Sequence, residues 1–272
     1  MKRLIVVLTL LLGACGQKHD SAWLGYGEGD YAFVSAPQAG WLTSLAVERG
    51  QLVHRGGLLF TLDSTEQRAS SDQAEAALVQ AKASLAQEEA NLTYMKTELA
   101  RQNRLMRANA GTQQAYDQAE NNARQSSARI AQMRAQIGQM EASLSGATYN
   151  LSQRRVASQT DGPVEDIYFR PGEYVPASTS VLSILPPANV YIRFFVPETQ
   201  LAKIHLGDRV RISCDGCRSM EAEVTFIASQ EEYTPPVIFS VGNREKLVFK
   251  VEARAKGGIP IHPGQPVEVR PL

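Results

Sequence analysis

The sequence predicts an α+β protein in which a long helical hairpin is inserted into a split β-sandwich and is followed by a small β-barrel. Three observations predict this fold: a pattern of glycines and apolar residues that recurs at an offset of 122 residues, two heptad-patterned segments between its copies, and several short alternating strands after the second copy. The resulting domains are the half-sandwiches 35–63 and 157–185, the hairpin 64–156 and the barrel 186–272.

Composition narrows the function classes. The chain of 272 residues is 43% hydrophobic, with 28 basic and 28 acidic side chains, so it is predicted to be ordered and has no excess charge that would attract nucleic acid. No nucleophile–His–acid arrangement, glycine-rich phosphate loop or paired histidine ligands occur. We therefore predict neither an enzyme activity nor a cofactor nor a metal site.

The N-terminus is predicted to be a lipoprotein signal peptide, residues 1–15. A basic start precedes the apolar run Leu4–Leu12, which is too short to span a bilayer as a mature helix. The run leads into LGAC, a motif that resembles a bacterial lipobox and predicts lipidation of Cys15. The alternative is an ordinary signal peptide with a chance cysteine. A linker and strand, residues 16–34, follow and lead into the sandwich or join the barrel.

The repeat predicts a single sandwich. At the offset of 122 residues, Gly40 aligns with Gly162 and Gly50 with Gly172, and the apolar positions between these glycines correspond as well. Each copy is predicted to form short strands around a glycine turn. Because neither copy is large enough to bury a core alone, we expect both to contribute to one sandwich.

The insert is predicted to be an antiparallel coiled coil. Ser64–Gln67 is a capping-box pattern that would begin the first helix. Apolar and small residues then step by alternating four and three residues along two arms of nearly equal length, which predicts helices that pair with each other. The first arm includes Glu88 and Gln102 at seam positions, which should reduce its stability. Arg154 and Arg155 are predicted to lie in the last turn of the second helix, where cations complement the helix dipole.

The segment after residue 186 is predicted to contain a strand, a short helical piece and several further strands. It includes the other two cysteines, Cys214 and Cys217, on either side of Asp-Gly, a dipeptide typical of two-residue hairpin turns. In an exported protein such a pair favours a disulfide, although the tiny closed loop would add little entropic stabilisation. Free thiols and a metal or redox site remain the alternatives.

Several blocks, in order, resemble the bacterial periplasmic adaptor, or membrane fusion, proteins of the hemolysin-secretion D (HlyD) family. SAPQAGWLTSLAVERGQLVHRGGLLFTLD resembles the first half of that family's split lipoyl-like domain, and FFVPETQLAKIHLGDRVRISCDG resembles the start of its barrel. EEYTPPVIFSVGNREKLVFKVEAR and HPGQPVEV are similar to adaptors that accompany ABC-type exporters. The resemblance covers nearly all of the mature chain. It implies a periplasmic, usually hexameric subunit that links an inner-membrane transporter to a TolC-like outer-membrane channel.

The resemblance also suggests residues for the channel contact at the hairpin tip. Channel-binding adaptors of this family have an Arg, a Leu four residues later and a Ser or Thr seven residues after that, and Arg101, Leu105 and Thr112 have this spacing. An exposed Leu could be covered by a partner, and Arg can donate several hydrogen bonds to a partner's carbonyl groups. The alternative is that Arg101 is a solvated side chain, Leu105 packs across the turn and Thr112 is only a helix cap.

The resemblance implies an adaptor for efflux or secretion that performs no chemistry itself. The chain leaves little sequence for the membrane-proximal domain found in many adaptors of proton-driven pumps, which favours an ABC permease and ATPase as partners. The architecture predicts a lipid anchor in the inner membrane of a Gram-negative bacterium, although Gly16 after the lipobox cysteine favours the outer membrane under the enterobacterial sorting pattern.

Two other functions are alternatives to the adaptor role. A structural coiled-coil lipoprotein of the cell envelope, without a transport role, is the main alternative, since nothing in the composition excludes it. A carrier domain of an enzyme complex would need a lysine at the turn between the two lipoyl-like halves, and neither junction, 62–65 or 157–160, contains one.

Overall fold

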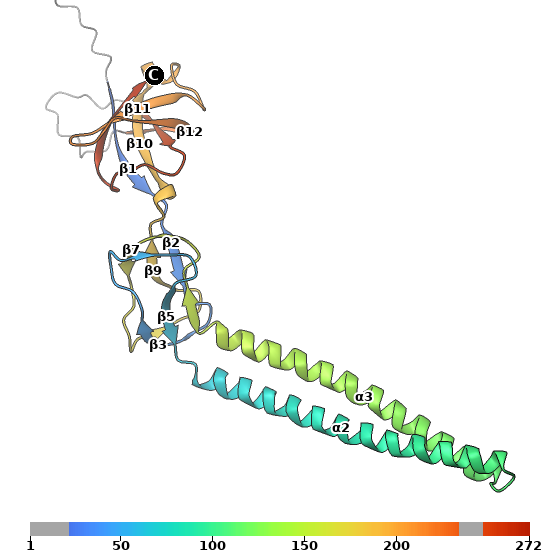
Figure 1. Ribbon diagram of the computed structural model, residues 1–272. Coiled ribbons are helices and arrows are strands. Elements are labelled where there is room, and N and C mark those ends of the chain that lie inside the picture. Colours follow the sequence, from blue (N-terminus) through green and yellow to red (C-terminus); the bar gives the residue numbers. More distant parts are fainter. Residues whose placement is uncertain (1–21, 234–246) are drawn as a thin grey trace, which may run out of the picture.

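The computed structural model describes residues 22–233 and 247–272 of the chain. It has three parts in succession: a β-barrel, a β-sandwich and a helical hairpin that projects from the sandwich (Figure 1). The fold class predicted from the sequence, a split sandwich with an inserted hairpin and a following barrel, is confirmed. Cys15 lies outside the described residues, as does part of the EEYTPPVIFSVGNREKLVFKVEAR block.

Two four-stranded sheets form the sandwich, in the orders β2-β9-β7-β4 and β6-β5-β3-β8. β4, from the first half, pairs with β7 from the second, and β8, from the second half, pairs with β3 from the first. Each sheet therefore contains strands from both halves, and the two halves together form one sandwich, as the repeat predicts. The strands are β2 (Ala32–Ser35), β3 (Gly40–Leu45), β4 (Leu52–Val53), β5 (Leu58–Leu62), β6 (Arg155–Ala157), β7 (Gly162–Ile167), β8 (Tyr174–Val175) and β9 (Ser180–Ile184).

The internal repeat is visible strand by strand. β3, β4 and β5 begin and end 122 residues before β7, β8 and β9, respectively. Gly50 and Gly172 occupy equivalent turns and both adopt the left-handed backbone conformation, with φ of +82° and +92°. Equivalent side chains such as Leu59 and Val181 are fully buried, so the two copies contribute matching halves of one apolar core.

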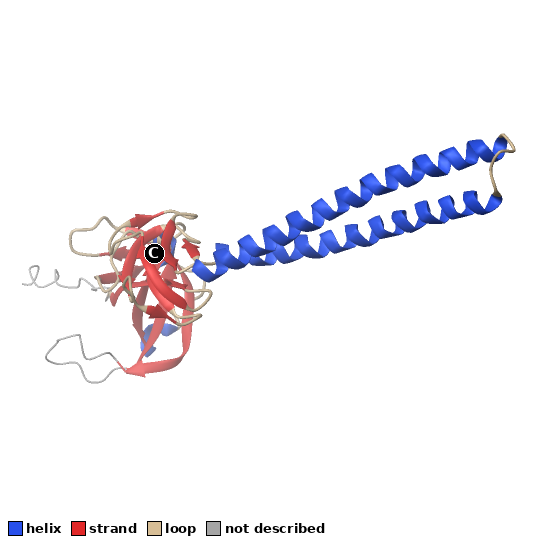
Figure 2. Ribbon diagram, turned by 90° about the horizontal axis from the view of Figure 1, so that it is seen from below, coloured by secondary structure: helices blue, strands red, loops and turns tan. Residues whose placement is uncertain are grey.

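The hairpin consists of α2 (Thr65–Arg107) and α3 (Gln113–Ser152). Every predicted seam position in both helices is buried or half-buried. In Figure 1 the two helices are seen apart near the sandwich and overlap near the tip, whereas Figure 2, turned by 90°, shows them apart near the tip. The helices therefore wind around each other along their length. At 1.5 Å per residue, α2 is roughly 65 Å long. Within the described part of the chain, no helix combines the length and the apolar character needed to cross a membrane.

A polar pair interrupts the apolar seam. Ser126 is almost fully buried in α3, and its Oγ donates a hydrogen bond of 2.6 Å to Glu88 Oε1 in α2. Asn91 donates a second hydrogen bond to the same oxygen. These bonds, from Ser126 first and Asn91 second, hold the pKa of Glu88 below its usual value. The seam thus accommodates a carboxylate by supplying donors.

Two predictions about the base of the hairpin were wrong. Ser64 precedes α2 as predicted but makes no side-chain capping bond, and its backbone, with φ of −116° and ψ of 9°, lacks the extended conformation typical of an N-cap. Asp63 Oδ1 accepts hydrogen bonds from the Thr65 backbone N–H (3.1 Å) and hydroxyl (2.7 Å). Arg154 and Arg155 lie beyond α3, which ends at Ser152. Arg154 is buried and its Nη1 donates to the Ala39 carbonyl at 2.8 Å, so it ties the chain to the sandwich instead of complementing the helix dipole.

The barrel closes in the order β1-β10-β13-β12-β11-β14. Its core contains Trp23, whose ring stacks on that of Phe194 with centroids 5.7 Å apart. The segment predicted as a linker and strand, residues 16–34, contributes to both domains, because β1 belongs to the barrel and β2 to the sandwich. The elements are β1 (Trp23–Gly29), η1 (Pro187–Asn189), β10 (Val190–Pro197), α4 (Glu198–Leu201), β11 (Arg209–Ser213), β12 (Met220–Tyr233), β13 (Leu247–Arg254) and β14 (Pro266–Pro271).

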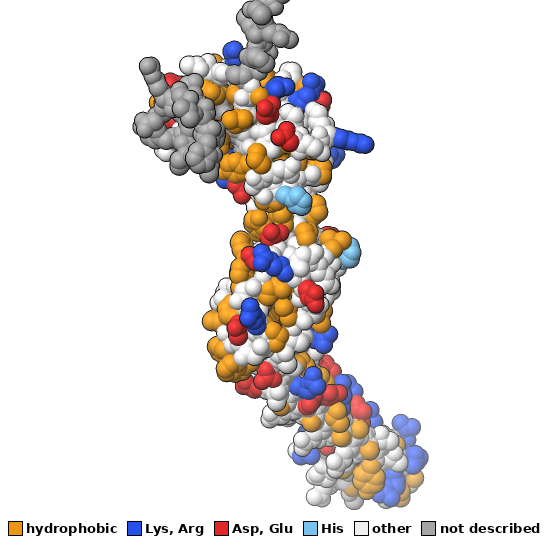
Figure 3. Space-filling model, turned by 90° about the vertical axis from the view of Figure 1, so that its left-hand side faces the viewer, with side chains coloured by type: hydrophobic (Ala, Val, Ile, Leu, Met, Phe, Trp, Pro, Cys, Tyr) orange, Lys and Arg blue, Asp and Glu red, His pale blue; other side chains and the backbone are white. Residues whose placement is uncertain are grey.

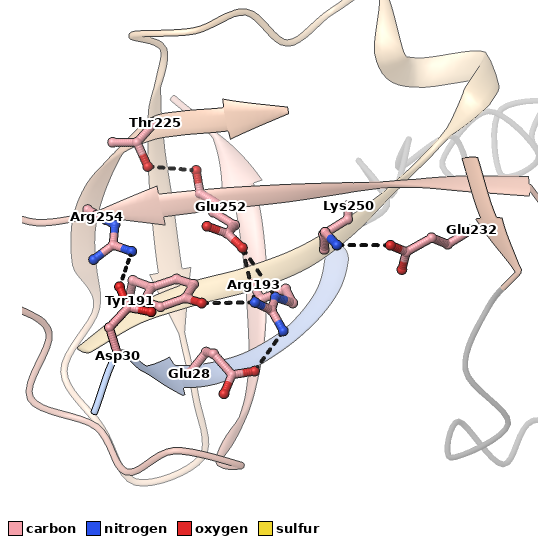
Figure 4. Close-up of polar contacts among 9 residues, drawn as sticks. All are labelled: Glu28, Asp30, Tyr191, Arg193, Thr225, Glu232, Lys250, Glu252 and Arg254. Atoms are coloured by element: carbon pink, nitrogen blue, oxygen red, sulfur yellow. Dashed lines mark hydrogen bonds and ion pairs between the residues drawn. The ribbon is translucent and has the colours of Figure 1, made fainter. Parts of the chain in front are cut away.

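A polar network fastens β1, β10 and β13 on the barrel surface (Figure 4). Arg193 Nη1 lies 2.9 Å from Glu28, and its Nη2 donates to Glu252 at 3.1 Å and to the Tyr191 hydroxyl at 2.8 Å. The Arg254 guanidinium lies over the Tyr191 ring, 4.2 Å from its centroid. Burial, followed by the nearby Glu252 carboxylate, raises the pKa of Tyr191. The network joins strands that are distant in the sequence.

Cys214 and Cys217 form a disulfide across a turn after β11. The Cys217 N–H donates to the Cys214 carbonyl at 3.3 Å, and Gly216 supplies the left-handed residue with φ of +79°. The predicted two-residue hairpin is wrong. The pair nearest the turn between β11 and β12 is Ile212 with Met220, so the connection is much longer than Asp215-Gly216. Asp215 lacks the positive φ that a type I′ turn requires at its first central position.

Candidate functional site at the hairpin tip

The helix α2 ends in a Schellman motif at the tip. Asn109 adopts the left-handed conformation with φ of +56°, which Asn tolerates better than most residues. The Ala110 N–H donates to the Leu105 carbonyl at 2.9 Å, and the Asn109 N–H donates to the Met106 carbonyl at 3.0 Å. These bonds satisfy carbonyls that the helix leaves free, so the heptads are interrupted by an ordered, hydrogen-bonded turn.

Gly111 and Thr112 return the chain into α3. A Cβ on Gly111 would lie 3.2 Å from the Leu105 Cβ and 3.1 Å from the Met106 nitrogen, so glycine allows the loop to pack closely on the last turn of α2. Thr112 has an extended backbone, and its Oγ1 accepts a hydrogen bond of 3.2 Å from the Ala115 N–H. Thr112 is therefore the N-cap of α3.

Arg101 is exposed and is oriented by a neighbouring carboxylate. Its Nη2 forms an ion pair with Glu98, one turn earlier in α2, while 61% of the Arg101 side chain remains accessible to solvent. Glu98 also accepts a hydrogen bond from Gln102 Nε2 at 2.7 Å. The bond from Gln102, and then Arg101, lower the pKa of Glu98. Arg101 is thus partly aligned while most of its donors remain available.

Leu105 lies one turn after Arg101, so both side chains share a stripe along α2. Leu105 is 38% exposed although it is a large apolar residue next to the turn. The structure therefore places Arg101 and Leu105 on one stripe of the last turns of α2, and Thr112 at the first residue after the turn. This geometry is compatible with a partner contact and, for Thr112, also with the capping role.

The tip is also basic, a feature that the sequence reasoning missed. No Asp or Glu occurs between Glu98 and Asp117, whereas three arginines do. Arg104 and Arg107 lie in the last turn of α2 and are exposed. Figure 3 shows Lys and Arg side chains gathered toward the distant end of the hairpin. The long interval without acidic residues is a signal that could have revealed this from the sequence.

The other described clusters offer little chemistry. Among residues 22–233 and 247–272, no group of three or more His, Cys, Asp or Glu side chains is placed to hold a metal ion. His54 Nδ1 lies 3.2 Å from Asp161 Oδ1, but both side chains are largely exposed. The hairpin tip is therefore the strongest candidate for a functional site.

Comparisons with known proteins agree with this architecture. Residues 77–154 match a family model described as the RND membrane fusion protein alpha-helical hairpin domain. The chain is 32% identical over 116 residues to the UPF0194 membrane protein in the asrC 5′ region of Acidithiobacillus ferridurans, a match that covers 42% of this chain and 34% of the relative. The matched segment thus spans about a third of that relative's length.

Two solved structures share the fold. The crystal structure of MacA from Actinobacillus actinomycetemcomitans superposes with a TM-score of 0.73 at 19% identity, covering 92% of this chain and 77% of MacA. The structure of the periplasmic adaptor protein EmrA superposes with a TM-score of 0.52 at 14% identity, covering 92% of this chain and 99% of EmrA. The hairpin of this chain is therefore similar to that of membrane fusion proteins, and the chain as a whole shares the fold of MacA and of the periplasmic adaptor EmrA.

Proposed function

We propose that the protein is the adaptor subunit of a tripartite export system, linking an inner-membrane transporter to a TolC-like outer-membrane channel for efflux or secretion. The observation that carries this proposal is an exposed tip at the end of a rod of roughly 65 Å, mounted on a compact base. The base and the tip are too far apart to act on one small ligand. A rod with this shape instead suits two partners that are held at a distance.

At the tip, Arg101, Leu105 and Thr112 would contact the channel. The Arg101 guanidinium has donors to spare beyond its ion pair with Glu98, and an exposed pair of this kind contributes little stability, so sharing it with a partner is not costly. Covering the Leu105 side chain would remove apolar surface from water. Thr112 would keep the turn in shape through its cap to Ala115.

At the other end, the barrel would face the transporter. β1 begins at Trp23 on the side of the barrel away from the sandwich, so the chain enters the described structure far from the hairpin tip (Figure 1). A lipid on Cys15 would then hold the barrel beside the inner membrane. We propose an ABC-type permease and ATPase as the partner. The match to the hairpin domain of RND membrane fusion proteins concerns only the hairpin, which would contact the channel and not the transporter.

The sandwich offers surface for packing copies side by side, as a hexameric ring would require. Figure 3 shows hydrophobic side chains gathered on one side of it. Trp41 and Tyr174 form an edge-to-face pair, yet each is more than half exposed. Exposed aromatic pairs of this kind are typical of protein–protein contacts.

The test is export by a deletion strain complemented with Leu105→Ser. The variant is expected to abolish export while leaving the protein level, measured by immunoblotting, and the helix content unchanged. Val79→Ser is a matched control, because Val79 is also an exposed apolar residue of α2 but lies far from the tip. Normal export with Leu105→Ser would show that the tip assignment is wrong. Normal export by the deletion strain itself would favour a structural lipoprotein of the envelope.

A further inference from the structure

A cleft lies at the root of the hairpin, where the two helices leave the sandwich (Figure 1). Its volume is about 460 Å³, which falls in the range of sites for small ligands. The lining residues come from β3, β5 and β6 of one sheet, from the chain around the start of α2 and from the end of α3. A molecule in this cleft would therefore touch both the hairpin and the sandwich.

Two arginines line the cleft from different elements. Arg68 lies near the start of α2, and Arg155 is the first residue of β6. In the described part of the chain, neither guanidinium has a carboxylate oxygen within 4.0 Å. Farther along the hairpin, by contrast, Arg134 Nη2 lies 2.9 Å from Glu89 Oε1. Because two like charges that line one cleft repel each other, the cleft favours a guest with negative charge.

Asp63 also borders the cleft, but its carboxylate is already engaged. Its Oδ1 accepts hydrogen bonds from the Thr65 hydroxyl at 2.7 Å and from the Thr65 N–H at 3.1 Å. These two bonds, and to a smaller degree the nearby charge of Arg154, hold the pKa of Asp63 below its usual value. The two arginines and the one carboxylate therefore leave a single positive charge in excess in the cleft.

Three hydroxyl groups add further donors. Thr43 belongs to β3, Ser64 directly precedes α2, and Thr148 lies near the end of α3. As far as the structure describes the chain, none of these hydroxyls forms a hydrogen bond with another protein group. Each can therefore donate to an oxygen of a bound molecule. Together with Arg68 and Arg155, they offer donors from both helices and from two strands.

We propose that this cleft, defined by Thr43, Ser64, Arg68, Thr148 and Arg155 and called the root cleft, binds a small phosphate-type oxyanion. Guanidinium groups bind phosphate oxygens with two parallel hydrogen bonds. A tetrahedral phosphate presents acceptors in several directions and can use donors from several walls at once, whereas a carboxylate has two oxygens in one plane. The proposal goes beyond the adaptor function and does not depend on it.

A bound oxyanion would bridge the hairpin and the sandwich, because Arg68 belongs to α2 and Arg155 to a strand of the sandwich. The hydrogen bond from Gln38 Nε2 to Asn150 Oδ1, at 3.3 Å, also joins the two domains, but it is exposed and restrains the hairpin only weakly. Charge-assisted bonds from both arginines to one anion would hold the root more firmly. Binding should therefore slow amide exchange at the start of α2 about threefold.

Isothermal titration calorimetry with inorganic phosphate tests the proposal on the mature full-length protein in about 20 mM NaCl, since salt screens exposed charges. The wild type is expected to bind with a dissociation constant below about 1 mM. Arg68→Gln and Arg155→Gln should each weaken binding about tenfold, because each removes charge-assisted hydrogen bonds. Arg104→Gln is the matched control, since Arg104 is also an exposed arginine of α2 but lies at the tip, and it should bind like the wild type.

Two milder variants separate specific recognition from simple charge attraction and from misfolding. Arg68→Lys keeps the charge but loses the planar fork, and should weaken phosphate binding about threefold. Thr148→Val removes one hydroxyl donor at an exposed position and should also weaken binding about threefold. Circular dichroism should show the helix content of the wild type in both variants.

The ligand class is tested with two further probes. Succinate, a dicarboxylate, should bind at least about tenfold more weakly than phosphate. Glycerol 3-phosphate distinguishes the source of the phosphate group: tighter binding than that of inorganic phosphate indicates a phosphate monoester, and weaker binding indicates the free ion.

Several results would overturn the inference. These are a wild type that does not bind phosphate, binding that is unchanged in both Arg68→Gln and Arg155→Gln, and succinate binding as tight as that of phosphate. If phosphate binds but amide exchange at the start of α2 is not slowed, the oxyanion does not bridge the two domains and that part of the proposal is wrong. Export assays are not needed for any of these results, so they stand apart from the test of the adaptor function.

Discussion

Removing the Thr112 hydroxyl separates a capping role from a partner contact. In Thr112→Ala, the Ala115 N–H loses the oxygen that accepts its hydrogen bond at 3.2 Å. Loss of an N-cap side chain costs about 1 kcal/mol. Because the tip is far from the sandwich and barrel cores, this cost should appear in the first turn of α3 and not in global unfolding. It corresponds to about fivefold faster amide exchange there.

Hydrogen–deuterium exchange of the α3 start measures this effect, with Thr112→Ser as the matched control that keeps the hydroxyl. Thr112→Asp adds a third arm, because a carboxylate is also a good cap at a helix N-terminus but places a negative charge on the tip. Unchanged exchange in Thr112→Ala would refute the capping argument. Export that fails in the Ala and Asp variants but not in the Ser variant would indicate a direct channel contact.

Three further predictions concern stability. Ile130→Ala removes a buried seam side chain and should lower the free energy of unfolding by about 3 kcal/mol in urea titrations. Ser126→Ala should raise the pKa of Glu88 in an NMR titration, because the hydrogen bond from Ser126 is the main cause of the lowered pKa. The stabilisation by that bond is present at neutral pH and is lost as the pH falls through the pKa of Glu88 in the folded protein. Cys214→Ser/Cys217→Ser opens a four-residue loop and should cost about 2 kcal/mol in thermal melts, the low end of what disulfides contribute because the closed loop is so short. An unchanged melt would show that the disulfide does not constrain the unfolded chain.

The internal repeat predicts strands of the sandwich that strand propensities alone would miss. Strands as short as β4 and β8 have two residues each, too few for a periodic signal. They could be anticipated because Gly50 and Gly172 mark the same turn in both copies. What the repeat could not show is the exchange of β4 and β8 between the halves, because pairing depends on the closed three-dimensional path of the chain.

The errors arose where two local signals compete. The capping box starting at Ser64 is a good pattern, but the Ser64 backbone is not extended, and the side-chain bonds at this helix start are those that Asp63 accepts from the Thr65 N–H and hydroxyl. Helix spacing alone places Arg154 in the last turn of α3, whereas its buried guanidinium donates to the carbonyl of Ala39, 115 residues away in sequence. Contacts of that range are not encoded in a local pattern.

At the tip, the sequence motif and the charge distribution are separate kinds of information. The spacing of Arg101, Leu105 and Thr112 could be matched to a family, whereas the pairing of particular charged residues between the two helices emerges only from the cross-helix register. That register follows from measured pairs such as Lys82 with Glu141. Heptads predict which residues face each other in general, but a turn of unknown length leaves the pairing of particular residues open.

The polar pair in the seam, Glu88 and Ser126, suits a rod whose end must be held at a defined position. Glu88 and Ser126 face each other near the middle of the hairpin. A shift of one heptad would set the carboxylate against Met133 or Ala119, neither of which can donate a hydrogen bond from its side chain. The half-buried Glu88 would then keep only the bond from Asn91 in its own helix. An apolar pair would tolerate such a shift more readily. The arrangement therefore trades seam hydrophobicity for a single register, and it is the register that determines where Leu105 stands at the tip.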